Sequence, residues 1–240
     1  VDPTNISTVL ATGTNVQITA DNDITVTSAI NAVSTVSGSL TLAAGRNVFV
    51  NANISVGAQF GSGGNLTISA NQSGAGFNAA NRSSGSSSID IASGVTLLST
   101  NGIGNSTITF NFGNADQGTS IPSNTLSMKG SLTANNVTVN GSTTQSTTFI
   151  GADATSVWSV TGTNSGTYSS VSNPLVNFNN ISSLVGGSGD DTFRFIGNGQ
   201  LSGSVDGGGG TNTLDLTQSN LAAGVFTVNP TSGFVVDSSS

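Results

Sequence analysis

The stretch NVQITADNDITVTSAI (15–30) decides the fold, because SLTLAAGRNVFVNANI (39–54) repeats its pattern twenty-four residues later. Five apolar positions of the first stretch fall on apolar positions of the second. The aligned pairs are Val16 with Leu40, Ile18 with Leu42, Ile24 with Val48, Val26 with Val50 and Ile30 with Ile54. Each unit therefore contains two short x-V-x-I segments separated by a polar turn, followed by a third apolar point.

Alternation of apolar and polar residues over three to five positions is typical of short strands with one buried face. Such strands bury that face when successive units stack in register. The sequence therefore predicts an all-β protein, a right-handed parallel β-helix with Asn- and Gly-rich corners. An antiparallel β-sandwich is the alternative, but it explains the alternation without explaining the repeat.

The repeat continues less regularly through 65–70, 88–99, 106–112 and 135–142. The Gly- and Ser-rich segment 72–88 interrupts it and is predicted to be a loop that leaves one corner. From about residue 149 the rungs become harder to recognise. We therefore expect β-helix rungs over 1–148 and a continuing β-rich module with Gly/Asp-rich turns over 149–240.

Composition supports this class and excludes others. Charged residues make up 6% of the 240 residues, His is absent, and the net charge is −7. The four basic residues are scattered, which argues against a nucleic-acid partner. No apolar run approaches the roughly 18 residues of a membrane-spanning helix. The opening residues VDPTN do not resemble a signal peptide, so we expect a mature fragment or a piece of a longer chain.

The segments LTLAAGRNVFVNANI, GNLTISA and SIDIASGVTLLST resemble the large secreted exoproteins of the filamentous-haemagglutinin type. These are two-partner-secreted bacterial proteins built as right-handed parallel β-helices. The resemblance implies an extracellular or cell-surface location. It also implies an adhesive role, or a place in a filament or in the stalk of a toxin.

A Gly/Asp-rich segment near the C-terminus resembles the repeats of repeats-in-toxin proteins. GGSGDDTFR (186–194) fits the nonapeptide G-G-x-G-x-D-x-U-x, and GGGGTNTLD (207–215) is a looser copy. Calcium needs six to eight oxygen ligands, so two stacked turns would have to share the ion. The candidate ligands are Gly187, Gly189, Asp190, Asp191, Asp206, Gly208 and Asn212.

The alternative interpretation is that these residues only form tight corners, where Gly supplies positive φ and Asp and Asn bond locally. Two features favour it. The copies are 21 residues apart, whereas calcium-binding turns stack at eighteen, and Asn212 replaces an Asp. Calcium and corner interpretations both remain open from the sequence.

Catalytic chemistry finds little support. Without His or Glu, general acid–base catalysis would depend on Asp alone, and Asp21 and Asp23 are expected to flank Asn22 in a solvated turn. Trp158, Tyr168, Phe178 and Phe60 would either stack on a glycan or fill the core, and we favour the core.

The sequence therefore predicts a non-enzymatic, extracellular adhesive rod whose loops and polar faces bind glycans or surface receptors. The loop 72–88 is its expected adhesive segment. The first alternative is a self-assembling subunit of a filament or sheath, made of copies stacked end to end. The second is a β-helical polysaccharide lyase or hydrolase.

Overall fold

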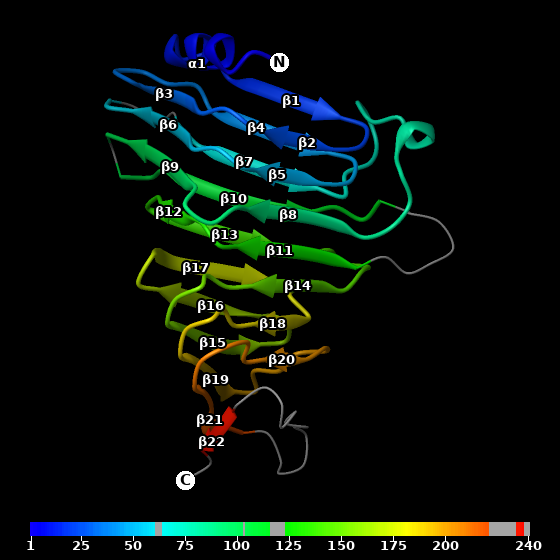
Figure 1. The fold of residues 1–240 in the computed structure, drawn as a ribbon, viewed down its shortest axis with the longest axis vertical. Helices are drawn as coiled ribbons and strands as arrows, with labels where there is room; N and C mark the ends of the chain where they lie inside the picture. Colours follow the sequence, from blue (N-terminus) through cyan, green and yellow to red (C-terminus); the bar gives the residue numbers. More distant parts are fainter. Residues whose placement is uncertain (61–63, 103, 116–122, 221–233, 238–240) are drawn as a thin grey trace.

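A computed structural model describes residues 1–60, 64–102, 104–115, 123–220 and 234–237. Strands lie across the long axis of the molecule and stack along it, with the N-terminus at one end and the C-terminus at the other (Figure 1). They form three sheets, which we call sheets A, B and C. The predominance of parallel strands confirms an all-β, β-helix-like solenoid.

Sheet A contains eleven strands. In spatial order these are β1 (Val16–Ala20), β4 (Leu40–Ala44), β7 (Leu66–Ala70), β10 (Thr107–Phe112), β13 (Asn136–Asn140), β17 (Asn173–Asn179), β16 (Ser165–Ser170), β15 (Ser156–Gly162), β19 (Asp191–Gly197), β21 (Asn212–Ser219) and β22 (Phe234–Asp237).

Sheet B contains seven strands and sheet C four. Sheet B runs β2 (Ile24–Val26), β5 (Val48–Val50), β8 (Ser87–Ile91), β11 (Asn124–Met128), β14 (Thr147–Ile150), β18 (Ser183–Val185) and β20 (Val205–Asp206). Sheet C runs β12 (Ser131–Thr133), β9 (Thr96–Asn101), β6 (Ile54–Ala58) and β3 (Ile30–Ser34). From β1 to β12 the chain visits A, B and C in turn, and one such circuit is a rung.

All five apolar pairs predicted from the repeat are register partners in the structure. Their side chains point inward, and those of Leu40, Leu42, Val48, Val50 and Ile54 are fully buried. The intervening residues face outward, as a two-residue strand period requires. The x-V-x-I pattern thus fixes both the register and the inner face.

The rung length is less constant than the repeat suggests. Hydrogen-bonded positions of neighbouring strands in sheet A are separated by 24 residues at first, then by 26, 42 and 29. The extra residues lie in the corners, whereas the strands keep their register. The loop predicted at 72–88 accounts for one long rung, although β8 already begins at Ser87.

Polar side chains link the rungs just before the strands begin. Asn15 Oδ1 accepts a hydrogen bond from the Ser39 backbone N–H (2.8 Å), and Asn65 Oδ1 accepts one from the Thr107 N–H (3.0 Å). Asn53 Oδ1 does the same for Thr96 in sheet C (2.8 Å). Asparagine at these corners therefore satisfies backbone donors of the next rung.

One helix departs from the expected all-β composition. α1 (Pro3–Ala11) begins with Asp2 as N-cap, whose carboxylate accepts a hydrogen bond from the Thr4 N–H (2.8 Å). It buries Ile6 and Leu10 against the first rung and contacts β3, where Ser7 Oγ accepts from the Asn31 N–H (3.0 Å). Asp2 followed by Pro3 is a typical helix start, but the strand-like composition of the surrounding sequence led to a prediction of strands alone.

The second departure is an antiparallel meander inside sheet A. β15 pairs antiparallel with β16, and β16 pairs antiparallel with β17, whereas β17 continues the parallel ladder on β13. Sheet B keeps β14 next to β18, so β15 and β16 have no counterparts there. The change in sequence texture near residue 149 lies just before this meander.

Candidate functional sites

The two Gly/Asp-rich turns lie one above the other. The first connects β18 to β19 and the second connects β20 to β21. The Gly209 N–H donates to the Gly187 carbonyl (2.9 Å), and the Gly186 N–H donates to the Asp206 carbonyl (2.9 Å). The structure therefore brings together the two segments that would share an ion in the calcium interpretation.

Asp191 is the buried carboxylate of this region, with only 1% of its surface exposed. Its Oδ1 accepts a hydrogen bond from Ser156 Oγ (2.5 Å), and its Oδ2 accepts one from the Gly187 N–H (3.0 Å). Its own N–H donates to Asn212 Oδ1 (3.0 Å). Burial raises the pKa of Asp191 above its ordinary value, although the hydrogen bonds from Ser156 and Gly187 act in the opposite direction.

The other candidate ligands also serve the turns. Asp190 Oδ1 accepts from the Thr211 N–H (2.7 Å), and Asp206 Oδ1 accepts from the Gly208 N–H (3.0 Å). Asn212 Nδ2 donates to the Gly209 carbonyl (3.0 Å).

All three of the candidate glycines are required by backbone geometry. A Cβ on Gly187 would lie 1.8 Å from the Ala152 carbonyl oxygen, and Gly208 has a φ of +72°. A Cβ on Gly189 would likewise collide with the Thr155 nitrogen, at 2.3 Å.

These contacts fit corners better than a calcium cage. Each carboxylate accepts a hydrogen bond from a backbone N–H of these turns, as a corner residue does. Among the described residues, no three acidic, His or Cys side chains gather closely enough to hold a metal ion. A calcium ion at these turns would therefore have to take most of its six to eight oxygens from backbone carbonyls and amide side chains. The calcium site stays a prediction, to be tested by the Asp191 substitution described in the Discussion.

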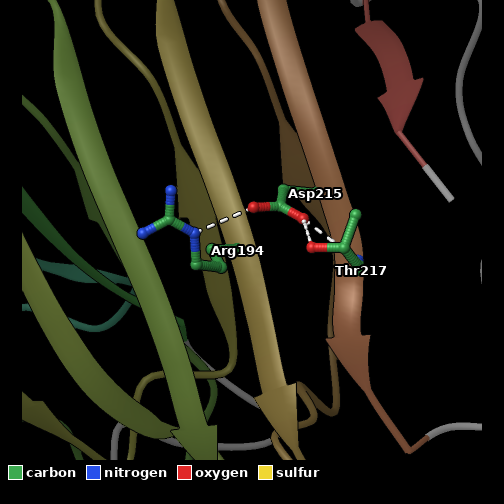
Figure 2. A network of polar contacts seen from close by, with 3 residues as sticks. All are labelled: Arg194, Asp215 and Thr217. Carbon is green, nitrogen blue, oxygen red and sulfur yellow. Dashed lines mark hydrogen bonds and ion pairs between the residues drawn. The ribbon is translucent and has the colours of Figure 1, made fainter. Parts of the chain in front are cut away.

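An ion pair crosses the outer side of the same region. Arg194 Nε on β19 donates to Asp215 Oδ2 on β21 (2.9 Å), as Figure 2 shows. Thr217 Oγ1 donates to the other carboxylate oxygen (2.6 Å). The hydrogen bonds from Thr217 and Arg194 lower the pKa of Asp215 below its ordinary value. This network stabilises the stacking of two neighbouring strands.

The predicted adhesive loop is fastened to the first rung. Asp21 accepts hydrogen bonds from the Asn78 N–H (2.8 Å) and from Asn81 Nδ2 (2.7 Å), and these bonds lower the pKa of Asp21. Asn22 Nδ2 donates to Ser83 Oγ (3.2 Å). The short 3-10 helix η1 (Ala79–Asn81) lies in this segment, which runs beside the β1 and β2 end of the stack (Figure 1).

The residues of the turn predicted at Asp21–Asp23 thus have two structural roles and are not only solvated. Asp21 and Asn22 hold the loop, whereas Asp23 Oδ1 accepts from Asn47 Nδ2 (2.8 Å) in the next rung. The sequence did not reveal the contacts with the loop, because Asn78 and Asn81 lie 57 and 60 residues from Asp21 along the chain. The two carboxylates have no common target.

Three of the four aromatic residues considered for glycan stacking belong to the core, as favoured. Trp158, Tyr168 and Phe178 are at most 1% exposed and pack with Phe149, whose ring centroid lies 4.9 Å from that of Trp158. They fill the space beside the antiparallel meander. Phe60 is 71% exposed and stays on the surface.

Sheet A carries rows of polar side chains; the sequence predicted polar faces, but not which residues align in them. In-register outward positions form one row of uncharged residues, namely Gln17, Thr41, Thr67, Thr109, Thr138 and Asn177. A second row contains Ser69, Asn111, Asn140 and Asn179. These rows could have been predicted from the sequence, because the residue between the two apolar positions of each strand must face outward.

The amides of the second row are hydrogen-bonded along the stack. Asn140 Nδ2 donates to Asn111 Oδ1 (2.9 Å), and Asn179 Nδ2 donates to Asn140 Oδ1 (3.4 Å). We call Asn111, Asn140 and Asn179 the amide ladder.

The described residues include no helix of the length and apolarity that a membrane crossing requires. Comparison with family models, curated proteins and solved structures found no match for this chain.

Proposed function

We propose that this chain is a rigid rod of an extracellular or cell-surface protein, a right-handed parallel β-helix whose polar faces attach to glycans. The observation that carries the proposal is the outer face of sheet A. Its first row presents hydroxyl and amide side chains in register from β1 to β17, its second row does so from β7 to β17, and the row positions carry no charge. Hydroxyl and amide groups both donate and accept hydrogen bonds, which suits the hydroxyls of a sugar.

The interior supports a mechanical role for the rod. One continuous apolar cluster extends from Ile6 on α1 to Leu214 on β21. Neighbouring rungs share this cluster, so each rung supports the next, as in other solenoids. Such a frame holds its surface side chains at fixed spacing, which reduces the entropic cost of binding an extended ligand.

Binding to an array of immobilised neutral and acidic glycans tests this function. We expect the folded chain to bind neutral glycans with little dependence on salt, because the row positions of sheet A are uncharged. The heat-unfolded chain is the control for nonspecific adhesion. Absence of binding to any glycan, or equal binding by the unfolded chain, would contradict the proposal.

End-to-end self-assembly is the second candidate, and the first rung favours it. A cleft of about 330 Å³ opens there between α1 and the rung, lined by Ile6, Ile18, Ile24 and Leu42 among others. No described strand pairs with the outer edges of β1 and β2. An unpaired strand edge over an apolar cleft can pair with an edge strand of a second copy.

Sedimentation at increasing protein concentration tests this candidate. In β2, the Ile24 N–H donates to the Asn47 carbonyl and the Val26 carbonyl accepts from the Asn51 N–H. Because backbone groups alternate in direction along a strand, the N–H of the intervening Thr25 points to the free edge. Thr25→Pro removes that donor without removing a bond to β5. We expect the parent chain to associate with concentration and Thr25→Pro to remain monomeric, and a parent chain that stays monomeric would exclude self-assembly.

A further inference from the structure

A polar pocket lies at the corner between sheets A and B. Its volume is about 270 Å³, and its nine lining residues are all Ser, Thr, Asn or Gln. They come from four separate connections along the chain, at 142–146, 164, 180 with 182, and 202. The pocket therefore contains no charged side chain, no aromatic side chain and no metal ligand of the preferred kinds.

The base of the pocket is held by hydrogen bonds between the connections. Asn164 Nδ2 donates to Ser202 Oγ (3.0 Å), and the Ser202 N–H donates back to Asn164 Oδ1 (2.8 Å). Ser182 Oγ, which is buried, donates to the Thr147 carbonyl (3.0 Å). These contacts fix the shape of the pocket before any ligand arrives.

The rim offers groups that are not used by the fold. Within the described part of the chain, the side-chain amide of Asn180 and the hydroxyl of Ser146 have no hydrogen-bond partner, and both residues are exposed. Asn180 has a φ of +54°, as does Asn164. A non-glycine residue in this left-handed region is uncommon, and its occurrence at two lining positions indicates a constrained corner.

The chemistry of the lining selects a class of ligand. A phosphate or carboxylate would need a cationic partner, which the lining lacks, and the net charge of −7 repels it. A metal ion would need carboxylates or imidazoles. A neutral sugar matches the lining, because its hydroxyl groups can donate to and accept from amides and hydroxyls.

The amide ladder continues from this pocket onto sheet A. Asn140 immediately precedes Gly141 and Ser142 at one side of the pocket, and Asn179 immediately precedes Asn180 at another. The ladder amides face outward from β10, β13 and β17, along the axis of the stack. A chain of sugars that begins in the pocket can therefore extend over a surface of the same chemistry.

We propose that this corner pocket is a binding site for a terminal residue of a neutral oligosaccharide, and that the amide ladder contacts the sugars that follow. This inference rests on the proposed glycan-binding function and assigns it to a place in the molecule. It assigns attachment to residues 142–146, 164, 180, 182 and 202 rather than to the loop 72–88.

Asn180→Gly is the informative substitution. Glycine adopts a positive φ freely, so the variant loses the amide but keeps the backbone conformation. Ser146→Ala removes the second free group. Asn51→Gly is the control, because Asn51 is an exposed asparagine between β5 and β6 that does not line the pocket. Thermal unfolding of all variants establishes that each one is folded.

The probes are oligosaccharides that end in galactose, mannose or N-acetylglucosamine, together with sialylated and sulfated glycans as acidic probes. We expect the parent chain to bind at least one neutral probe. Asn180→Gly and Ser146→Ala should each weaken that binding about three- to tenfold, the loss expected for one hydrogen bond. The control should bind like the parent.

Each other outcome has a definite meaning. Unchanged affinity in Asn180→Gly and Ser146→Ala, with binding by the parent, would overturn the pocket but leave the proposed function standing. Binding to acidic probes alone would also overturn the pocket. Absence of binding to every probe would overturn both proposals.

Discussion

At Asp191, burial and hydrogen bonding act in opposite directions on one carboxylate. Burial has the larger effect, so the pKa is raised in the folded chain above the ordinary value of 3.8. The folded state then binds the proton more tightly than the unfolded state. The contribution of Asp191 to stability is therefore greatest below pH 3.8 and declines as the pH rises through its raised pKa.

Asp191→Asn removes this ionisation while leaving an amide that can accept from Gly187 and donate to Ser156. We expect the variant to be at least as stable as the parent at pH 7, with the advantage disappearing in acid. Thermal unfolding from about pH 4 to pH 7, in chelator and in millimolar calcium, measures it. A calcium site predicts the reverse: calcium would raise the melting temperature of the parent and not that of the variant.

Asp215 has the opposite behaviour, because the hydrogen bonds from Thr217 and Arg194 lower its pKa. Its contribution to stability is present above pH 3.8 and is lost as the pH falls through the lowered pKa. Asp215→Asn should lower the free energy of unfolding by about 0.5–1.5 kcal/mol at pH 7. Denaturant unfolding at pH 7 and at about pH 2 checks this, and an equal difference at both values would refute it.

At the scale of the elements, the segment between β7 and β8 is held by side chains of the first rung. Asp21→Ala removes the acceptors for Asn78 and Asn81, so we expect the segment to be cleaved faster by proteases while the melting temperature changes little. Asp23→Ala instead removes an acceptor that joins two rungs. It should lower the melting temperature and leave loop cleavage unchanged. Identical behaviour of the two variants would contradict the division of roles.

The elements also show what the sequence can predict. The register of the first two rungs followed from five apolar pairs, because only one alignment puts them all on the inner face. The helix α1 was not predicted, because only its capping residues indicate a helix and the surrounding composition favours strands. The meander escaped because antiparallel and parallel strands share the same alternation. The pocket escaped because its walls come from four connections that only the stacking brings together.

At the scale of the whole molecule, the aromatic cluster joins the regular rungs to the meander. Phe149 on β14 contacts Trp158, Tyr168 and Phe178, which lie on the three strands of the meander. Phe149→Ala should therefore cost about 3–5 kcal/mol. It should also weaken the coupling between the two halves, because a solenoid transmits stability only through neighbouring units.

The single Trp158 makes this coupling measurable. Its fluorescence reports on the meander, whereas far-UV circular dichroism reports on all strands. In the parent we expect both signals to change together in urea, since one core cluster spans the stack. In Phe149→Ala the fluorescence change should come at lower urea. Coincident transitions in the variant would show that the two halves are joined elsewhere.

Because the rungs differ in length, the number of residues in a rung and the distance between neighbouring strands vary independently. Neighbouring strands are about 4.8 Å apart whether their hydrogen-bonded positions are 24 or 42 residues apart in the sequence. The length of the rod therefore depends on the number of rungs and not on the number of residues. Insertions at a corner enlarge what the rod displays without altering where the next rung begins. The stacked strands thus form a scale of fixed spacing, on which surface segments can be exchanged while every rung keeps its position.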